Sequence, residues 1–277
     1  MKLRVESPGD PALLAILQRH PNVELCPSPR TAGNLSATGL SRKDSASTDG
    51  GLASCRQDAS GTFRSRQDAS GTLVFHQGDW RREVRVADPT CEVRGLVELM
   101  DNNPMVCADV VSVPSPGATL ALIALGPLAK AGLLLEPPTL LANTPLDEQD
   151  IANYLATEGW EAGAVGSAQA EDLDGILAMT AIAAVRLPPN PEDLAGIYDE
   201  CFGRSFFVHH DAASIWHVNL VKGTPNAVYR LSLNREDSVG LLTIKVMADA
   251  DGKCGAAQVV HAMNVMAGLE ESLGLGL

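Results

Sequence analysis

The sequence predicts a mixed protein, with an α/β first part and an α+β second part. Two short strand candidates near the start, at residues 3–5 and 22–25, flank PALLAILQRH, whose apolar residues repeat at helical spacing. In the second half, β-rich runs follow one another with fewer helices between them. Because a strand, a helix and a parallel strand form the usual unit of nucleotide-binding sheets, we expect the N-terminal part to open such a sheet.

The composition fits a globular protein and limits its partners. The chain has 277 residues, is 45% hydrophobic and carries a formal net charge of −13. An acidic surface repels phosphate backbones and anionic lipids, so we expect neither nucleic acid nor a membrane as partner. Small-molecule anions at a local basic site and protein partners remain open. The N-terminus lacks the long apolar stretch of a secretory signal, which predicts a cytoplasmic location.

Residues 26–94 are rich in Ser, Thr, Gly, Asp and Arg and are expected to contribute little to a core. The heptapeptide RQDASGT occurs twice, at 56–62 and 66–72, which favours a duplicated surface loop. A phosphate site on its Ser-Gly-Thr amides would need a helix behind it, but the following LVFHQGDW is strand-like.

A Ser-Pro-Gly turn at 115–117 is the strongest local motif. The segment 105–114 (MVCADVVSVP) is typical of a buried strand, and 118–135 of a buried helix too interrupted to span a membrane. Such strand-to-helix turns often hold nucleophiles or bound anions. Ser115 is the only nucleophile in this turn, and it would need a base brought in by the fold.

The remaining elements follow in order. We expect strands at 176–187, 205–210, 226–234 and 240–249, and helices at 191–203 and 256–269. The resulting sheet is suited to cover a partner subunit.

The cysteines lack the spacing of a metal or disulfide framework. They are scattered without a CxxC pair, so reduced thiols and no metal site are expected. The six are Cys26, Cys55, Cys91, Cys107, Cys201 and Cys254.

In the order of its motifs, the chain resembles N-acetyl-gamma-glutamyl-phosphate reductase, of the aspartate-semialdehyde dehydrogenase superfamily. The most specific match is the tail at 252–275, where Lys253, Gln258, Met263 and Asn264 stand at positions of the family's closing-helix pattern. The other matching segments are PALLAILQRHPNVEL (11–25), EVRGLVEL (92–99), ATLALIALGPLAKAGLL (118–134), GIYDECFGRSFFV (196–208) and VKGT (221–224).

The resemblance implies a fold and an activity. The fold is a reduced Rossmann-like domain, residues 1–117 with 254–277, and a semialdehyde-dehydrogenase-like dimerisation domain, residues 118–253. The activity is NADPH-dependent reduction of an acyl phosphate to a semialdehyde, in arginine biosynthesis, by a homodimer. It needs a dinucleotide pocket, a reactive thiolate and a histidine. The family's positions imply Gly9, Gly117, Gln258 and Asn264 as NADP-binding candidates, and Lys222 and Arg230 as candidates for an anionic substrate.

The chain departs from the family at each catalytic feature. The glycine-rich turn retains only Gly9, and the nucleophilic cysteine corresponds to Pro116, beside Ser115. The place of the family's histidine reads GSAQAEDLDG, at 166–175. Cys107 is expected to be a buried strand residue, and Lys222 is as readily explained as a solvated loop lysine.

Two hypotheses follow from these departures. The first is a catalytically degenerate member with a structural or regulatory role, without an assigned catalytic residue. The second is an active NADP-dependent oxidoreductase in which Ser115, Cys91 or Cys107 serves as a displaced nucleophile.

Overall fold

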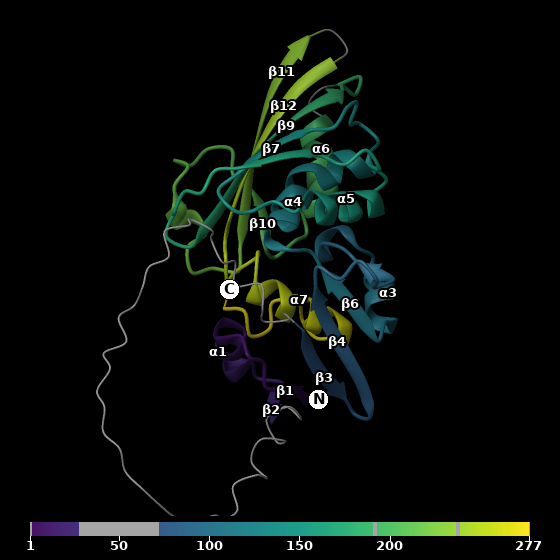
Figure 1. Ribbon diagram of the computed structural model, residues 1–277, viewed down its shortest axis with the longest axis vertical. Coiled ribbons are helices and arrows are strands. Elements are labelled where there is room, and N and C mark those ends of the chain that lie inside the picture. Colours follow the sequence, from purple (N-terminus) through teal and green to yellow (C-terminus); the bar gives the residue numbers. More distant parts are fainter. Residues whose placement is uncertain (1, 28–71, 191–192, 237–238, 277) are drawn as a thin grey trace, which may run out of the picture.

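The computed structural model describes residues 2–27, 72–190, 193–236 and 239–276. Two six-stranded sheets lie one above the other along the long axis of the molecule (Figure 1). Both sheets mix parallel and antiparallel pairs, so the predicted mixed α/β fold class is confirmed. The RQDASGT repeat lies outside the described residues, apart from its last threonine.

The first sheet begins with the predicted parallel unit. Strand β1 pairs in parallel with β2, and α1 (Pro11–Arg19) joins them, burying Leu13 and Leu17. The strand order is β2-β1-β3-β4-β6-β5. The strands are β1 (Leu3–Glu6), β2 (Val23–Cys26), β3 (Leu73–Gln77), β4 (Trp80–Val86), β5 (Val93–Arg94) and β6 (Val110–Val113).

Two expectations for this region are wrong. Residues 26–94 were expected to contribute little to a core, but 73–86 form the antiparallel hairpin β3–β4 in the middle of the sheet. Leu73, Phe75 and Val84 are fully buried, because their apolar positions face the core. Residues 105–107 belong to the helix α3 (Asn102–Cys107) and not to the strand, which starts only at Val110. Pro104 lies within the first turn of α3, where a missing N–H costs nothing.

The second sheet has the order β10-β11-β12-β9-β7-β8, and helices α4, α5 and α6 cover one of its faces (Figure 1). The helix α4 (Pro116–Lys130) is buried over almost its whole length. The other elements are β7 (Thr139–Ala142), α5 (Glu148–Thr157), β8 (Val165–Ala168), β9 (Ile176–Arg186), α6 (Asp193–Phe202), β10 (Val208–His210), η2 (Val218–Leu220), β11 (Ala227–Glu236) and β12 (Val239–Asp249).

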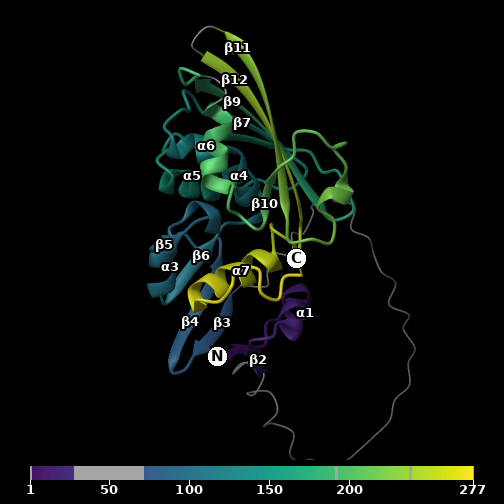
Figure 2. The same cartoon turned by 180° about the vertical axis from the view of Figure 1, so that it is seen from behind.

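The last helix, α7 (Ala256–Ala267), returns to the first sheet and lies between the two layers (Figure 2). The Arg82 side chain of β4 is fully buried and anchors it. Its guanidinium donates to the Met266 carbonyl oxygen at the end of α7 and, at 2.9 Å, to that of Met105 in α3. A cation at two helix ends satisfies carbonyls that lack helical partners.

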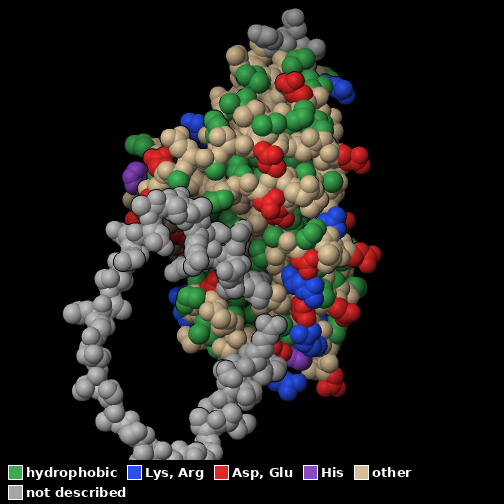
Figure 3. All heavy atoms as spheres, viewed as in Figure 1, with side chains coloured by type: hydrophobic (Ala, Val, Ile, Leu, Met, Phe, Trp, Pro, Cys, Tyr) green, Lys and Arg blue, Asp and Glu red, His purple; other side chains and the backbone are tan. Residues whose placement is uncertain are grey.

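Charged side chains gather over the part of the first sheet formed by β3 and β4 (Figure 3). There Arg85 forms ion pairs with Glu83 and Asp88, both at 2.8 Å. No helix in the described parts of the chain is long and apolar enough to cross a bilayer.

Candidate functional site

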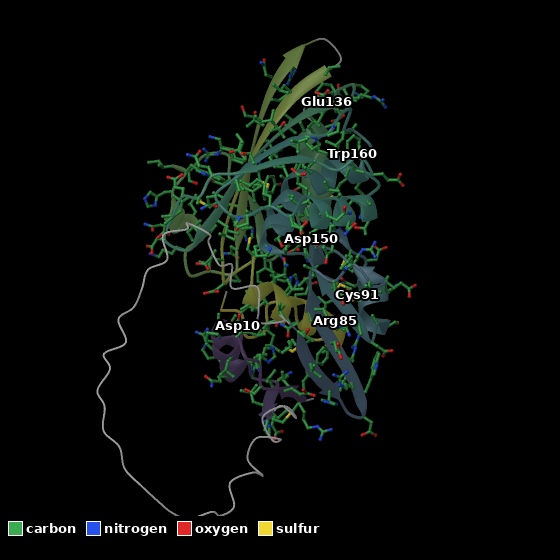
Figure 4. All side chains as sticks on the ribbon, in the orientation of Figure 1. Asp10, Arg85, Cys91, Glu136, Asp150 and Trp160 are labelled. Carbon is green, nitrogen blue, oxygen red and sulfur yellow. The ribbon has the colours of Figure 1, made fainter. Side chains whose placement is uncertain are left out.

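A cleft of about 1060 Å³ opens where the first sheet meets the helices of the second. Strand β6 ends at Val113, and the turn 115–117 starts α4 at the wall of this cleft. The opposite wall is the loop 144–147 with the first turns of α5, from which Asp150 projects between the two layers (Figure 4). This is the place where the family resemblance puts the nucleophile.

Ser115 is used as a helix cap. Its Oγ accepts a hydrogen bond from the Ala118 N–H at 3.3 Å, and Pro116, at the first helical position, has no N–H to offer. The described residues that line the cleft include neither histidine nor cysteine. Among its described lining residues the site therefore presents a hydroxyl beside the Asp150 carboxylate, but no imidazole and no thiol.

Three carboxylates give the cleft a negative lining. Asp147 caps α5 by accepting from the Gln149 and Asp150 N–H groups at 3.0 and 3.1 Å. Glu148 accepts from the Gly166 N–H at 3.0 Å, and Asp150 from the Ser115 N–H at 3.4 Å. Burial raises the pKa of Asp150, and none of the described lining residues is Lys or Arg. The arrangement disfavours an anionic ligand.

The displaced thiols of the alternative hypothesis lie elsewhere. Cys91 is buried outside the cleft lining, and burial raises its pKa, the opposite of what a nucleophile needs (Figure 4). Cys107 is exposed at the end of α3, so the expectation that it is buried is wrong, because its segment is an exposed helix. In the described ranges, no group of His, Cys, Asp and Glu is arranged to hold a metal ion.

The turn after β1 does not fit a dinucleotide pyrophosphate. Gly9 stands in this turn, but the next residue, Asp10, accepts from the N–H groups of Ala12 and Leu13 at 2.8 and 3.0 Å. Pro11 lacks an N–H. A carboxylate of the chain itself therefore occupies the helix amides that a phosphate would use, and it would repel one.

The other NADP-binding candidates make contacts within the chain. Gln258 donates to the Pro114 carbonyl oxygen at 3.2 Å and to Thr119 Oγ1 at 3.1 Å, which ties α7 to the start of α4. Asn264 is fully buried and bonds to His20 and to the segment after α7. Gly117 does line the cleft. A Cβ there would lie 3.0 Å from the Pro145 carbonyl oxygen, so glycine allows close packing.

The substrate candidates Lys222 and Arg230 are not among the residues that line this cleft. Lys222 forms an exposed ion pair with Asp174. Arg230 pairs with Asp211 at 3.0 Å and lies over the Trp216 ring at 5.0 Å. Both cations are thus already paired.

The capping and lining carboxylates Asp10, Asp147 and Asp150 were not predicted from the sequence. The signal for Asp10 was present, since Asp directly before a predicted helix is a preferred N-cap, whereas the helix α5 that Asp147 caps was not predicted. Asp150 gave no local signal, because its contact with Ser115 spans 35 residues.

Comparison with known proteins finds likenesses among solved structures. No protein-family model and no curated protein matches the chain. Among solved structures, the chain is similar to a crystal structure of aspartate semialdehyde dehydrogenase II from Vibrio cholerae, complexed with ASA. The identity is 11% and the TM-score 0.49, over 63% of this chain and 68% of that chain.

Proposed function

We propose that this chain is a non-catalytic, divergent relative of the NADP-dependent semialdehyde dehydrogenases, with a structural or regulatory role. The observation that carries the proposal is the start of α4, where Ser115 and Pro116 face a cleft lined by three carboxylates. The order of the sequence motifs and the two-layer mixed α/β architecture support the relationship.

The reductase chemistry has no route through these residues. A thioester mechanism needs a thiolate of lowered pKa and a proton donor beside it. An acyl phosphate would meet Asp147, Glu148 and Asp150 at close range, without a cation from the described lining to offset them.

The same reasoning applies to the cofactor. If NADP were bound after β1, its pyrophosphate would displace the Asp10 carboxylate from two backbone amides. We therefore propose that the dinucleotide function has been lost together with the nucleophile.

The retained function is assembly, in this proposal as a homodimer through the open face of the second sheet. On this face the exposed Leu141 and Leu241 alternate with buried residues along β7 and β12, and Val165 of β8 is exposed as well. The register places Val165 beside Thr139, on the same face as Leu141. The face also carries Thr243 and Lys245 beside these apolar side chains, a mixture that is suited to pack on a second copy.

The test is a titration of the full chain with NADPH, followed by thermal shift and tryptophan fluorescence. We expect no saturable stabilisation at millimolar NADPH, because a ligand that binds the native state must raise its stability. The matched variant Asp10→Ala frees the Ala12 and Leu13 N–H groups. If this variant binds NADPH, the Asp10 carboxylate alone blocks the turn; if it does not, the turn lacks the geometry for a pyrophosphate. Saturable micromolar binding by the unchanged protein, with turnover of an acyl phosphate, would overturn the proposal.

A further inference from the structure

A second group of titratable side chains lies away from the cleft, buried between the layers. Lys253, just before α7, and His261, in α7, have side chains that are only 1% exposed, and that of Glu98, in the 3-10 helix η1 (Val97–Leu99), is 4% exposed. Glu271, from the segment after α7, completes the group and is 35% exposed. Four separate parts of the chain meet here, because Ser205 also donates to Glu98 at 3.2 Å.

The contacts fix the protonation of His261. The Lys253 ammonium, which can only donate, lies 2.6 Å from Glu98 Oε1 and 3.4 Å from His261 Nδ1. The Nδ1 atom must therefore accept, so the proton of the neutral ring is on Nε2, which donates to Glu271 Oε2 at 2.9 Å. The edge-on Phe207 ring, 4.6 Å between centroids, fills another side of the imidazole.

The group is short of one positive charge. With His261 neutral, one ammonium stands against two carboxylates, and among the described residues no further charged group contacts the imidazole from the elements packed on it. Glu98 Oε2 is buried and has no hydrogen-bond partner in the described ranges. A buried carboxylate oxygen without a donor is costly and marks a place for one more proton.

We infer that this group is a proton-operated switch, in which His261 takes one proton from solvent and transfers its Nδ1 contact from Lys253 to Glu98. Protonated Nδ1 can no longer accept from Lys253, and the two cations repel each other. Glu98 Oε1 is already 3.9 Å from Nδ1, so a small rotation brings Nδ1–H to the free Oε2. No bond other than N–H forms, and the partly exposed Glu271 gives water access to the ring.

The turn that carries Lys253 is in direct contact with a second turn, at 221–224. Lys253 belongs to the tight turn 249–255, and Asp249 in this turn accepts from the Gly223 N–H at 2.7 Å. A Cβ on Gly252 would lie 2.2 Å from the Thr224 carbonyl oxygen, so the two turns are in close contact. Movement of Lys253 is therefore transmitted to the turn 221–224, which carries Lys222.

The test is imidazole 15N NMR on the full chain, from pH 8 to 4.5, with His261 assigned by the His261→Gln variant. We expect the Nε2–H form at high pH and a single step to the doubly protonated ring, with the Glu98 Cδ resonance moving at the same midpoint. Glu271→Gln removes the carboxylate that accepts from Nε2 and should lower the midpoint by about one pH unit. Glu98→Gln should lower it as well, because the protonated ring loses the charge that receives Nδ1–H.

Two results would overturn the switch. The first is an Nδ1–H ring at high pH. The second is a Glu98 Cδ resonance that does not follow the His261 midpoint in the unchanged protein, which can be measured even if Glu98→Gln does not fold.

Discussion

His20 Nε2 lies 3.0 Å from Asn264 Oδ1, and this buried contact joins the end of α1 to α7 across 244 positions of the sequence. His20 Nδ1 accepts from the Asn22 N–H at 3.2 Å, so the ring is neutral with its proton on Nε2. His261, on the same helix α7, is held in the same form. The helix that connects the two layers thus depends on two uncharged imidazoles.

We expect stability to fall in mild acid because of these two rings. Burial lowers the pKa of both His20 and His261 below the usual value of 6.5. Their contribution is therefore fully present above about pH 6.5 and is lost as the pH falls through the lowered folded-state values. The measurement is the free energy of unfolding in urea between pH 7.5 and 5.

The control for this prediction is a pair of glutamine variants. Burial raises the pKa of Glu158 to about 6, which increases stability in the same window as pH falls, so the slope of the unchanged protein alone is not decisive. His20→Gln and His261→Gln should each flatten the acid slope relative to the parent. Equal slopes in all three proteins would refute the role of the histidines.

Asp150→Asn should leave stability unchanged or raise it at pH 7. The carboxylate is 8% exposed and burial raises its pKa, so a neutral amide avoids the cost of a buried charge and still accepts from the Ser115 N–H. We expect a gain of up to about 1 kcal/mol in the free energy of unfolding. The matched variant Asp147→Ala removes the cap of α5 and should cost about 1 kcal/mol. A large loss in Asp150→Asn would show that its charge has an undetected partner.

Arg82→Met should be strongly destabilising. The fully buried guanidinium donates to carbonyl oxygens of Met105, Val106, Ala108 and Met266, which methionine leaves without donors. We expect a loss of about 3 kcal/mol or more, measured by denaturant unfolding. The exposed neighbour Arg81, with an ion pair to Glu83, is the control, and its change to Met should cost less than about 1 kcal/mol.

Leu141→Lys should abolish self-association. Leu141 is 48% exposed on the open face of the second sheet, so the variant keeps the fold but places a charge in the proposed dimer interface. Sedimentation should give a dimer for the parent and a monomer for the variant, with unchanged circular dichroism. Val106→Lys, which changes an exposed apolar side chain in α3 beside the first sheet, is the control. A monomeric parent would contradict the assembly proposal.

Local sequence patterns were enough to predict many of the helices and long strands. Apolar spacing located α1, α4, α7 and the strands β9, β11 and β12, because helical and strand periodicities depend on neighbouring residues alone. The position of Pro116 at the start of α4 also follows from neighbouring residues alone. The strand character of 73–77 was predicted correctly, but the polar composition of 26–94 hid its contribution to the core. Residues 105–107 were wrongly assigned to a strand because a short helix precedes that strand.

The roles of side chains that meet over long sequence distances follow from the packed fold and not from local sequence. Gln258 reaches Pro114 across 144 positions, and Lys253 reaches Glu98 across 155. Asn264, a cofactor candidate by resemblance, bonds to His20. Such contacts produce no periodic pattern in the sequence. They depend on how the two sheets and their helices pack, and on which buried polar atoms then find a hydrogen-bond partner.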